Sequence, residues 1–150
     1  MATDYPVKLA INLSPRINRT PPEVSISVPG HATHETLWKP KRIELEYSGS
    51  QGQLEVTFHN KNYNECTGTH DMAVVIDSVE FFGISDPRFV WAGVYWPEYP
   101  EPWLSQQTPP PQAALTNHNY LGWNGVWRLN FDVPVFTWIH KTLGMGWVYQ

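Results

Sequence analysis

Short runs in which every second residue is apolar recur along this sequence, and they constrain its fold more than any other feature. A period of two puts successive side chains on opposite faces of a β-strand, so that one face is buried and the other meets water. This pattern predicts half-buried strands at residues 5–13, 24–28, 43–47, 54–58 and 127–135. The nearly continuous apolar run at residues 73–82 predicts a central strand that is covered on both faces.

Turn-forming residues separate these runs and argue against a helical bundle. The chain holds 14 Pro and 10 Gly, and residues 105–119 form a long polar stretch rich in Pro. The loop at 48–52 predicts a hairpin between its flanking strands, and Asn124-Gly125 predicts another hairpin. With a further strand at 89–95, we expect eight or nine short strands and no helix. The predicted fold is therefore all-β: an antiparallel β-sandwich of jelly-roll type with long Pro-rich loops.

The chain length predicts one domain, over residues 1–150. Residues 14–22 contain three prolines and separate the first predicted strand from the second. Residues 1–22 are therefore candidates for an extended N-terminal arm. An exposed strand in such an arm carries unpaired backbone groups, which favour pairing with another chain.

Charge and composition exclude several classes of protein. The net charge is −4 and the ten Lys and Arg residues form no basic stripe, so we expect no nucleic-acid partner. No apolar run approaches the roughly 20 residues of a membrane-spanning helix, so we expect no membrane partner. The single cysteine, Cys66, excludes an intramolecular disulfide. Residues 1–5 lack a basic region before an apolar core, which predicts folding in the cytoplasm and is compatible with a virion protein released by lysis.

One stretch of the chain, residues 54–83, matches a known signature at scattered positions. The matching residues are Phe58, Asn60, Asp71, Val74, Ile76 and Asp77. In this respect the stretch resembles the calcium-dependent xylan-binding carbohydrate-binding modules. The resemblance implies a β-sandwich of jelly-roll type that binds sugar hydroxyls through calcium, with Asn60, Asp71 and Asp77 as candidate calcium ligands.

The stretch departs from that signature where the metal chemistry is concentrated. Lys61 stands where the family has Asp, and Met72 and Ala73 replace Arg and Asn. Calcium takes six to eight oxygen ligands, so Lys61 removes one carboxylate and adds a competing cation. The implied fold therefore carries over better than the implied metal site. We expect no cofactor, with calcium at Asn60, Asp71 and Asp77 as the alternative.

A segment rich in aromatic residues and Pro begins within the predicted strand at 89–95 and continues to residue 103. Its candidate binding residues are Trp91, Tyr95, Trp96, Tyr99 and Trp103. Three interpretations stay open, since such rings can pack in the core, anchor a protein interface, or offer flat apolar faces to sugars. The flanking prolines stiffen the segment and lower the cost of ordering it on binding.

Other polar residues offer little support for catalysis or metal binding. His31, His34 and Glu35 lie close together in a predicted solvated loop, and His59 and His70 flank the loop that ends at Asp71. Asp77 and Glu80 are three residues apart on a predicted strand, so we expect them on opposite faces. The sequence contains no nucleophile elbow, phosphate-binding loop or zinc signature, and we expect no enzymatic activity.

Two hypotheses for the function remain. The first is a non-enzymatic structural protein that assembles into an oligomer with itself or other protein subunits, such as a capsid decoration or tail protein of a phage virion. It depends on the predicted edge strand, the Pro-rich loops and the aromatic segment. The second is a carbohydrate-binding module that recognises a polysaccharide through the aromatic loop, with or without calcium.

Overall fold

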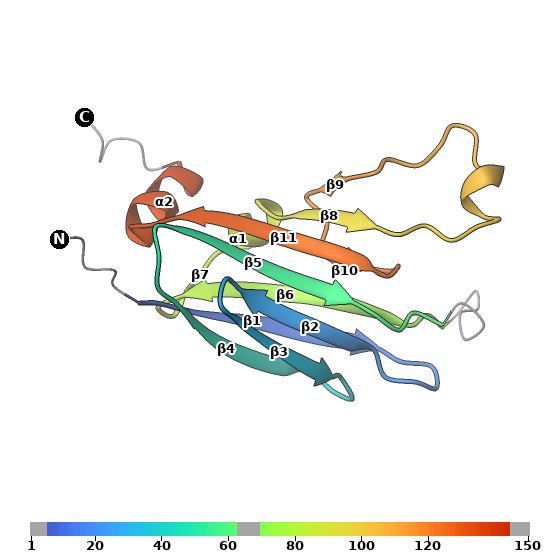
Figure 1. The fold of residues 1–150 in the computed structure, drawn as a ribbon, viewed down its shortest axis with the longest axis horizontal. Coiled ribbons are helices and arrows are strands. Elements are labelled where there is room, and N and C mark those ends of the chain that lie inside the picture. The colour runs from blue at the N-terminus through green and yellow to red at the C-terminus, as the bar shows by residue number, and fades with distance from the viewer. Residues whose placement is uncertain (1–5, 63–69, 145–150) are drawn as a thin grey trace.

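Two antiparallel sheets packed face to face form the body of the molecule in the computed structural model, which describes residues 6–62 and 70–144 (Figure 1). The first sheet has the order β10-β6-β1-β4, with β7 beside β6. Its strands are β1 (Val7–Arg16), β4 (Lys41–Tyr47), β6 (Ala73–Phe81), β7 (Ile84–Ser85) and β10 (Tyr120–Leu121). The second sheet has the order β3-β2-β5-β11-β8-β9. Its strands are β2 (Glu23–Val28), β3 (His31–Thr36), β5 (Gln51–Phe58), β8 (Val94–Pro97), β9 (Leu115–Thr116) and β11 (Gly125–Asp132).

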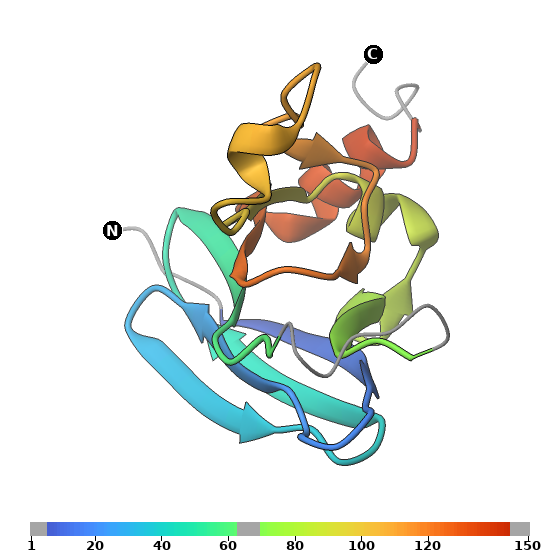
Figure 2. The ribbon, with the colours of Figure 1, turned by 90° about the vertical axis from the view of Figure 1, so that its right-hand side faces the viewer.

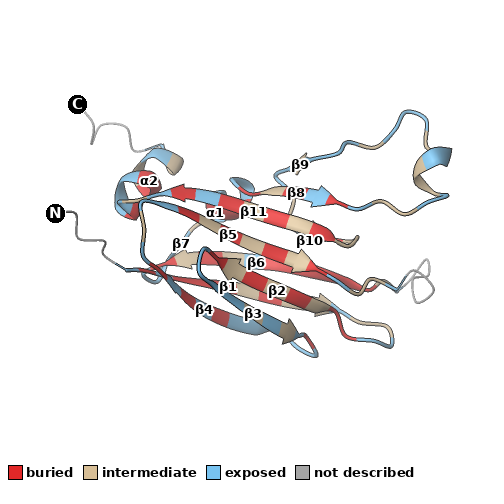
Figure 3. Cartoon of the chain, viewed as in Figure 1, coloured by how far each residue is buried: buried red, intermediate tan, exposed pale blue. Residues whose placement is uncertain are grey.

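The alternating pattern produces this architecture, and the predicted antiparallel β-sandwich is confirmed. In β5 the residues Leu54, Val56 and Phe58 are buried, while those between them are half-buried. Inward-facing residues of β1 and β6 meet them in one continuous core. Buried and exposed positions therefore alternate along the long strands in Figure 3.

The first strand lies inside its sheet. β1 pairs with β4 on one side and with β6 on the other, both antiparallel. Its inner face carries Leu9, Ile11 and Leu13, and Ala10 is also buried. The expectation of an N-terminal arm over residues 1–22 is therefore wrong for residues 7–16, because burial of this face favours pairing within the chain.

The chain passes repeatedly from one sheet to the other, and both predicted hairpins are wrong for this reason. The loop at 48–52 joins β4 of the first sheet to β5 of the second, and Asn124-Gly125 follows β10 of the first sheet and opens β11 of the second. Gly125 has a φ of 148°, and a Cβ there would lie 2.3 Å from the Trp96 carbonyl oxygen. This glycine permits the close approach of β11 to β8 instead of closing a hairpin.

Two helices correct the expectation of an all-strand chain. α1 (Pro87–Trp91) starts where the Asp86 carboxylate accepts a hydrogen bond from the Arg88 backbone N–H at 2.9 Å. The strand expected at 89–95 therefore begins only with β8. α2 (Val135–Thr142) buries Val135, Trp138 and Ile139, which recur at helical spacing on one face. The strand expected at 127–135 ends with β11 at Asp132.

A register shift explains why Asp77 and Glu80 do not lie on opposite faces. The pairing of β1 with β6 steps from Ser78 to Ile76, so that Asp77 is an extra residue in β6. Ile76 and Val79 are fully buried, whereas Asp77 is exposed and Glu80 is half-buried. Both carboxylates therefore lie on the outer, solvent-facing side of the first sheet.

The connection from β8 to β10 projects from one end of the sandwich, away from α2 (Figures 1 and 2). It contains the single-turn 3-10 helix η2 (Leu104–Gln106) and the short strand β9. This connection supplies most of the residues of the site described below. Within residues 6–62 and 70–144, no helix is both long and apolar enough to cross a membrane.

Candidate functional site

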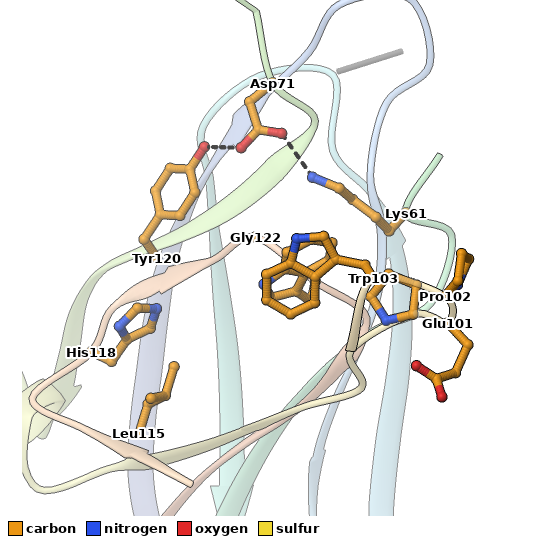
Figure 4. A pocket seen from close by; sticks show the side chains of 11 residues that line it. Lys61, Asp71, Glu101, Pro102, Trp103, Leu115, His118, Tyr120 and Gly122 are labelled. Carbon is orange, nitrogen blue, oxygen red and sulfur yellow. Dashed lines mark hydrogen bonds and ion pairs between the residues drawn. The ribbon is translucent and has the colours of Figure 1, made fainter. Parts of the chain in front are cut away.

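A cavity of about 620 Å³ opens at this end of the sandwich, and we call it the end pocket. Its lining comes from Lys61 after β5, from Asp71 before β6, and from residues 100–103 and 115–123 of the connection that leads to β11. Figure 4 shows the side chains that surround it. The sheets hold these segments together although they are far apart in the sequence.

Three aromatic rings, which we call the pocket cluster, form one wall of this end. The ring centroids of Trp103 and Trp123 are 5.1 Å apart, and those of Tyr99 and Trp103 are 5.5 Å apart. All three side chains are half-buried. The Tyr99 hydroxyl donates to the Gln112 carbonyl oxygen at 2.8 Å. This bond joins the two sides of the connection between β8 and β10.

Tyr95 positions Trp123 from inside the core. Its ring is fully buried, and its hydroxyl donates to the Trp123 carbonyl oxygen and accepts from the Trp123 backbone N–H at 3.1 Å. A buried phenol needs such partners, because its hydroxyl is otherwise cut off from water. The ring of His118 stacks on Tyr95 with centroids 5.5 Å apart and lines the pocket.

An ion pair between Lys61 and Asp71 forms the polar part of the pocket. The Lys61 Nζ lies 2.7 Å from Asp71 Oδ1 and 2.7 Å from the Met72 carbonyl oxygen. The other carboxylate oxygen, Oδ2, accepts from the Tyr120 hydroxyl (Figure 4). The Lys61 side chain is only 4% exposed and that of Asp71 is 37% exposed, so the carboxylate is the more accessible partner.

Neighbouring asparagines fix the backbone that carries Lys61. The Lys61 backbone N–H donates to Asn124 Oδ1 at 2.8 Å. The Asn60 side chain accepts from the Glu23 backbone N–H at 2.7 Å and donates to the Pro21 carbonyl oxygen at 3.1 Å. These bonds anchor the residues after β5 to β2 on one side and to the start of β11 on the other.

The other carboxylate of the lining, Glu101, is turned away from this ion pair. Glu101 Oε1 accepts from the Ser105 backbone N–H at 2.8 Å, and Figure 4 shows its carboxylate directed away from Asp71 and Lys61. The pocket therefore combines indole surfaces with the partly exposed carboxylate of Asp71. Such a combination suits a ligand that has both flat apolar faces and hydroxyl groups.

The five aromatic residues that the sequence singles out do not form one surface. Tyr99 and Trp103 belong to the pocket cluster, but Tyr95 lies in the core. Trp96 is 39% exposed on the outer side of β8, where the Arg128 guanidinium lies 5.3 Å from its ring centroid. Trp91 is exposed on α1. Tyr95 and Trp96 are successive residues of β8 and therefore point to opposite faces of the sheet, whereas Trp91 lies on α1.

Sequence reasoning missed Trp123 and Tyr120 as site residues. Both lie in the segment before Gly125, which we interpret from the sequence only as a turn. Their importance depends on the pairing of β10 with β6 and of β11 with β8, which brings this segment beside Asp71 and Lys61. No local pattern in the sequence indicates that Tyr120 and Trp123 lie beside Asp71 and Lys61.

The three candidate calcium ligands have separate hydrogen-bond partners. Asn60 bonds residues around β2, Asp71 bonds Lys61 and Tyr120, and Asp77 Oδ2 accepts from the Ser14 hydroxyl on the outer side of the first sheet. The described part of the chain contains no group of three or more His, Cys, Asp and Glu side chains arranged to hold a metal. Asn60, Asp71 and Asp77 are therefore each held by a different part of the chain.

The histidine-rich segment forms a strand instead of the expected loop. His31, His34 and Glu35 lie on β3, which pairs with β2 at the edge of the second sheet. His59 stacks on His34 with ring centroids 5.6 Å apart and lies 2.6 Å from the Ser25 hydroxyl. The same hydroxyl also lies 3.4 Å from His34 Nδ1, so one nitrogen of each ring contacts Ser25.

Comparisons with known proteins give one structural likeness. No protein family model matches this sequence, and no curated protein matches it. The chain is similar in structure to vCBM60, solved in its selenomethionine form and described in work on a circular permutation that links two families of calcium-dependent carbohydrate-binding modules. The TM-score is 0.49 with 18% sequence identity, over 82% of this chain and 89% of that one.

Proposed function

We propose that this chain is a non-catalytic carbohydrate-binding module that holds a sugar in the end pocket. The observation that carries the proposal is the meeting of the Trp103 and Trp123 rings with the accessible carboxylate of Asp71 in one cavity. The flat C–H face of a sugar packs on an indole, and its hydroxyls donate to a carboxylate. The candidate binding residues are therefore Tyr99, Trp103, Trp123 and Asp71.

The chemistry of the two carboxylates in the pocket supports binding without catalysis. Hydrolysis of a glycosidic bond uses two carboxyl groups that face each other across that bond. Asp71 is paired with Lys61, and Glu101 accepts hydrogen bonds from the Ser105 backbone and hydroxyl. Each carboxylate already serves as a structural acceptor, and Glu101 is directed away from Asp71.

A glycan screen followed by calorimetry tests the proposal. We expect the purified chain to bind a neutral polysaccharide, and we expect Trp123→Ala to weaken that binding by at least tenfold. Trp38→Ala is the matched control, because Trp38 is an indole that is 67% exposed and does not line the pocket. If Trp123→Ala keeps the melting temperature of the natural chain, its weaker binding reflects the lost contact with the sugar and not a loss of folding. Equal binding by both variants, or no glycan bound at all, would contradict the proposal.

The assembly hypothesis and its virion setting stay predictions. One of the features behind them is an exposed N-terminal strand, and β1 instead pairs on both sides within the chain. Light scattering on the purified chain measures the relevant quantity. A large oligomer would favour the assembly hypothesis, whereas a 17.3 kDa monomer would favour the binding module.

A further inference from the structure

We propose that the Lys61 ammonium is the resident cation of the end pocket, in the position where a calcium-dependent site would hold its metal. The chain then keeps the pocket folded, and binds its sugar, without calcium. The second half of this inference rests on the proposed function, and the first half does not.

The acceptors beside Lys61 already have donors. Asp71 Oδ1 accepts from Lys61 Nζ at 2.7 Å and from the Met72 backbone N–H at 2.9 Å. Asp71 Oδ2 accepts from the Tyr120 hydroxyl, and the Met72 carbonyl oxygen accepts from Lys61 Nζ at 2.7 Å. These three oxygens are what a hard cation would take here. A calcium ion would have to displace the ammonium from two of them and the phenol from the third.

The charge of Lys61 also opposes a metal. Its side chain is 4% exposed, so the ammonium lies in the interior of the pocket wall, where water screens its charge little. Asp71 supplies one negative charge, which Lys61 neutralises. A divalent ion in the same place would be repelled by this positive charge. It would also lack the carboxylate that the family resembled by residues 54–83 has at position 61.

Lys61 joins the two halves of the pocket, as a metal would. Through Nζ it holds Asp71 and Met72 at the start of β6, and the same atom lies 5.7 Å from the centroid of the Trp123 ring. Its backbone N–H bonds Asn124 beside that tryptophan. Lys61 is therefore a positioning residue: it orients the Asp71 carboxylate and the Trp123 indole relative to each other.

Thermal melting of the whole chain in EDTA and in millimolar calcium tests the first half. We expect the same melting temperature for the natural chain in both conditions. We expect Lys61→Met to lower it by several degrees, because Asp71 then loses its counter-charge in a partly buried site. Lys41→Met is the control: Lys41 is 50% exposed where Lys61 is 4% exposed, and it pairs with Glu35, so its loss should lower the melting temperature less. A calcium-induced rise in the natural chain, or equal effects of the two variants, would overturn the proposal.

A charge-reversing variant tests whether this position is a cation position. Lys61→Asp removes the ammonium and sets a second carboxylate beside Asp71. We expect this variant to be destabilised in EDTA and to regain several degrees of melting temperature in calcium. Terbium luminescence excited through tryptophan should appear in Lys61→Asp and vanish when Asp71→Asn is added. If calcium leaves the melting temperature of Lys61→Asp unchanged and terbium gives no luminescence with it, then Lys61 does not occupy a metal position.

Sugar binding in EDTA tests the second half separately. Binding that is retained in EDTA supports the inference, and binding that is lost in EDTA overturns it while leaving the proposed function intact. If no sugar binds in either condition, the proposed function fails and this half fails with it. The melting and terbium measurements decide the first half in every case.

Discussion

Two groups of aromatic side chains lie at opposite ends of the sandwich, and they differ in what surrounds them. The pocket cluster of Tyr99, Trp103 and Trp123 is half-buried, and its two tryptophans line a cavity that Asp71 also lines. Near α1 and α2, a second group lies in the core. This core cluster consists of Phe81, Phe89, Phe131 and Trp138, which are 0%, 0%, 2% and 9% exposed.

The spacing of the rings is nearly the same in the two clusters. Phe81 lies 5.0 Å from Phe131 between centroids and 5.3 Å from Trp138, whereas Trp103 lies 5.1 Å from Trp123. Ring contacts alone therefore do not distinguish stability from binding. The difference is that two helices, α1 and α2, supply two rings of the core cluster, whereas the Pro-rich connection from β8 to β10 borders the pocket cluster. The clusters should respond to mutation in opposite ways.

The largest effect should follow from removing a ring of the core cluster. Phe81→Ala deletes a fully buried ring that packs edge-on against three others, so we expect a loss of roughly 3–5 kcal/mol in the free energy of unfolding. Urea denaturation measures it. The fraction that stays folded should bind sugar as the natural chain does. A loss below about 1 kcal/mol would mean that this end of the core is loosely packed.

The corresponding change in the pocket cluster should affect binding instead. Trp103→Ala removes a half-buried ring that packs against Tyr99 and Trp123 and lines the cavity. We expect the dissociation constant for the sugar to rise about thirtyfold, which is roughly 2 kcal/mol, with little change in unfolding. Calorimetry and urea denaturation on the same sample measure both quantities. A stability loss as large as that of Phe81→Ala would erase the distinction between the clusters.

Removing an aromatic residue outside both clusters should change the free energy of unfolding only slightly and should leave sugar binding unchanged. Trp96→Ala removes an exposed indole that lies against the Arg128 guanidinium on the outer side of β8. We expect a loss of about 0.5–1 kcal/mol in stability, the usual size of such a contact at the surface, and unchanged sugar binding. A tenfold loss of binding would instead assign Trp96 to the site.

The strands could be predicted from the sequence because their signal is local, but the sheets could not. Residues 43–47 and 54–58 alternate correctly and both form strands, yet β4 and β5 belong to different sheets. Their partners, β1 and β11, are distant in the sequence, and only the packing of the two faces selects them. A short loop between two strands therefore does not make them neighbours.

Helix α2 shows how a local pattern can mislead. Val133 and Val135 continue the alternation of β11, so the sequence predicts that the strand runs on. Trp138 and Ile139 fit a helical period from Val135 instead, and burial of this face against the core decides for the helix. The competing period was visible in the sequence but weaker than the alternation before it.

The candidate site was predictable only in part. Tyr99, Trp103, Asp71 and Lys61 stand out because of their type or their departure from a signature. Trp123 completes the pocket and carries no such mark, since its role arises from the buried hydroxyl of Tyr95 that fixes its backbone. Residues that act through a distant neighbour leave no local trace in the sequence.

The smallest effect should come from the hydroxyl that fastens the pocket loop. Burial raises the pKa of the Tyr99 phenol above its ordinary value of about 10. Because the folded pKa is the higher one, the contribution of this phenol to stability is complete below about pH 10 and is lost as the pH rises through the folded pKa. Tyr99→Phe should cost roughly 0.5 kcal/mol at neutral pH, through the bond to the Gln112 carbonyl oxygen.

Urea denaturation of the natural chain and of Tyr99→Phe at a series of pH values isolates this group, because every other tyrosine is common to both. The difference in unfolding free energy should be constant up to about pH 10 and should shrink above it. Parallel curves through that range would mean that the Tyr99 hydroxyl is as well solvated as in the unfolded chain. A difference that shrinks above this pH would therefore show that ionisation of Tyr99 weakens the bond that holds the pocket loop to the Gln112 carbonyl oxygen.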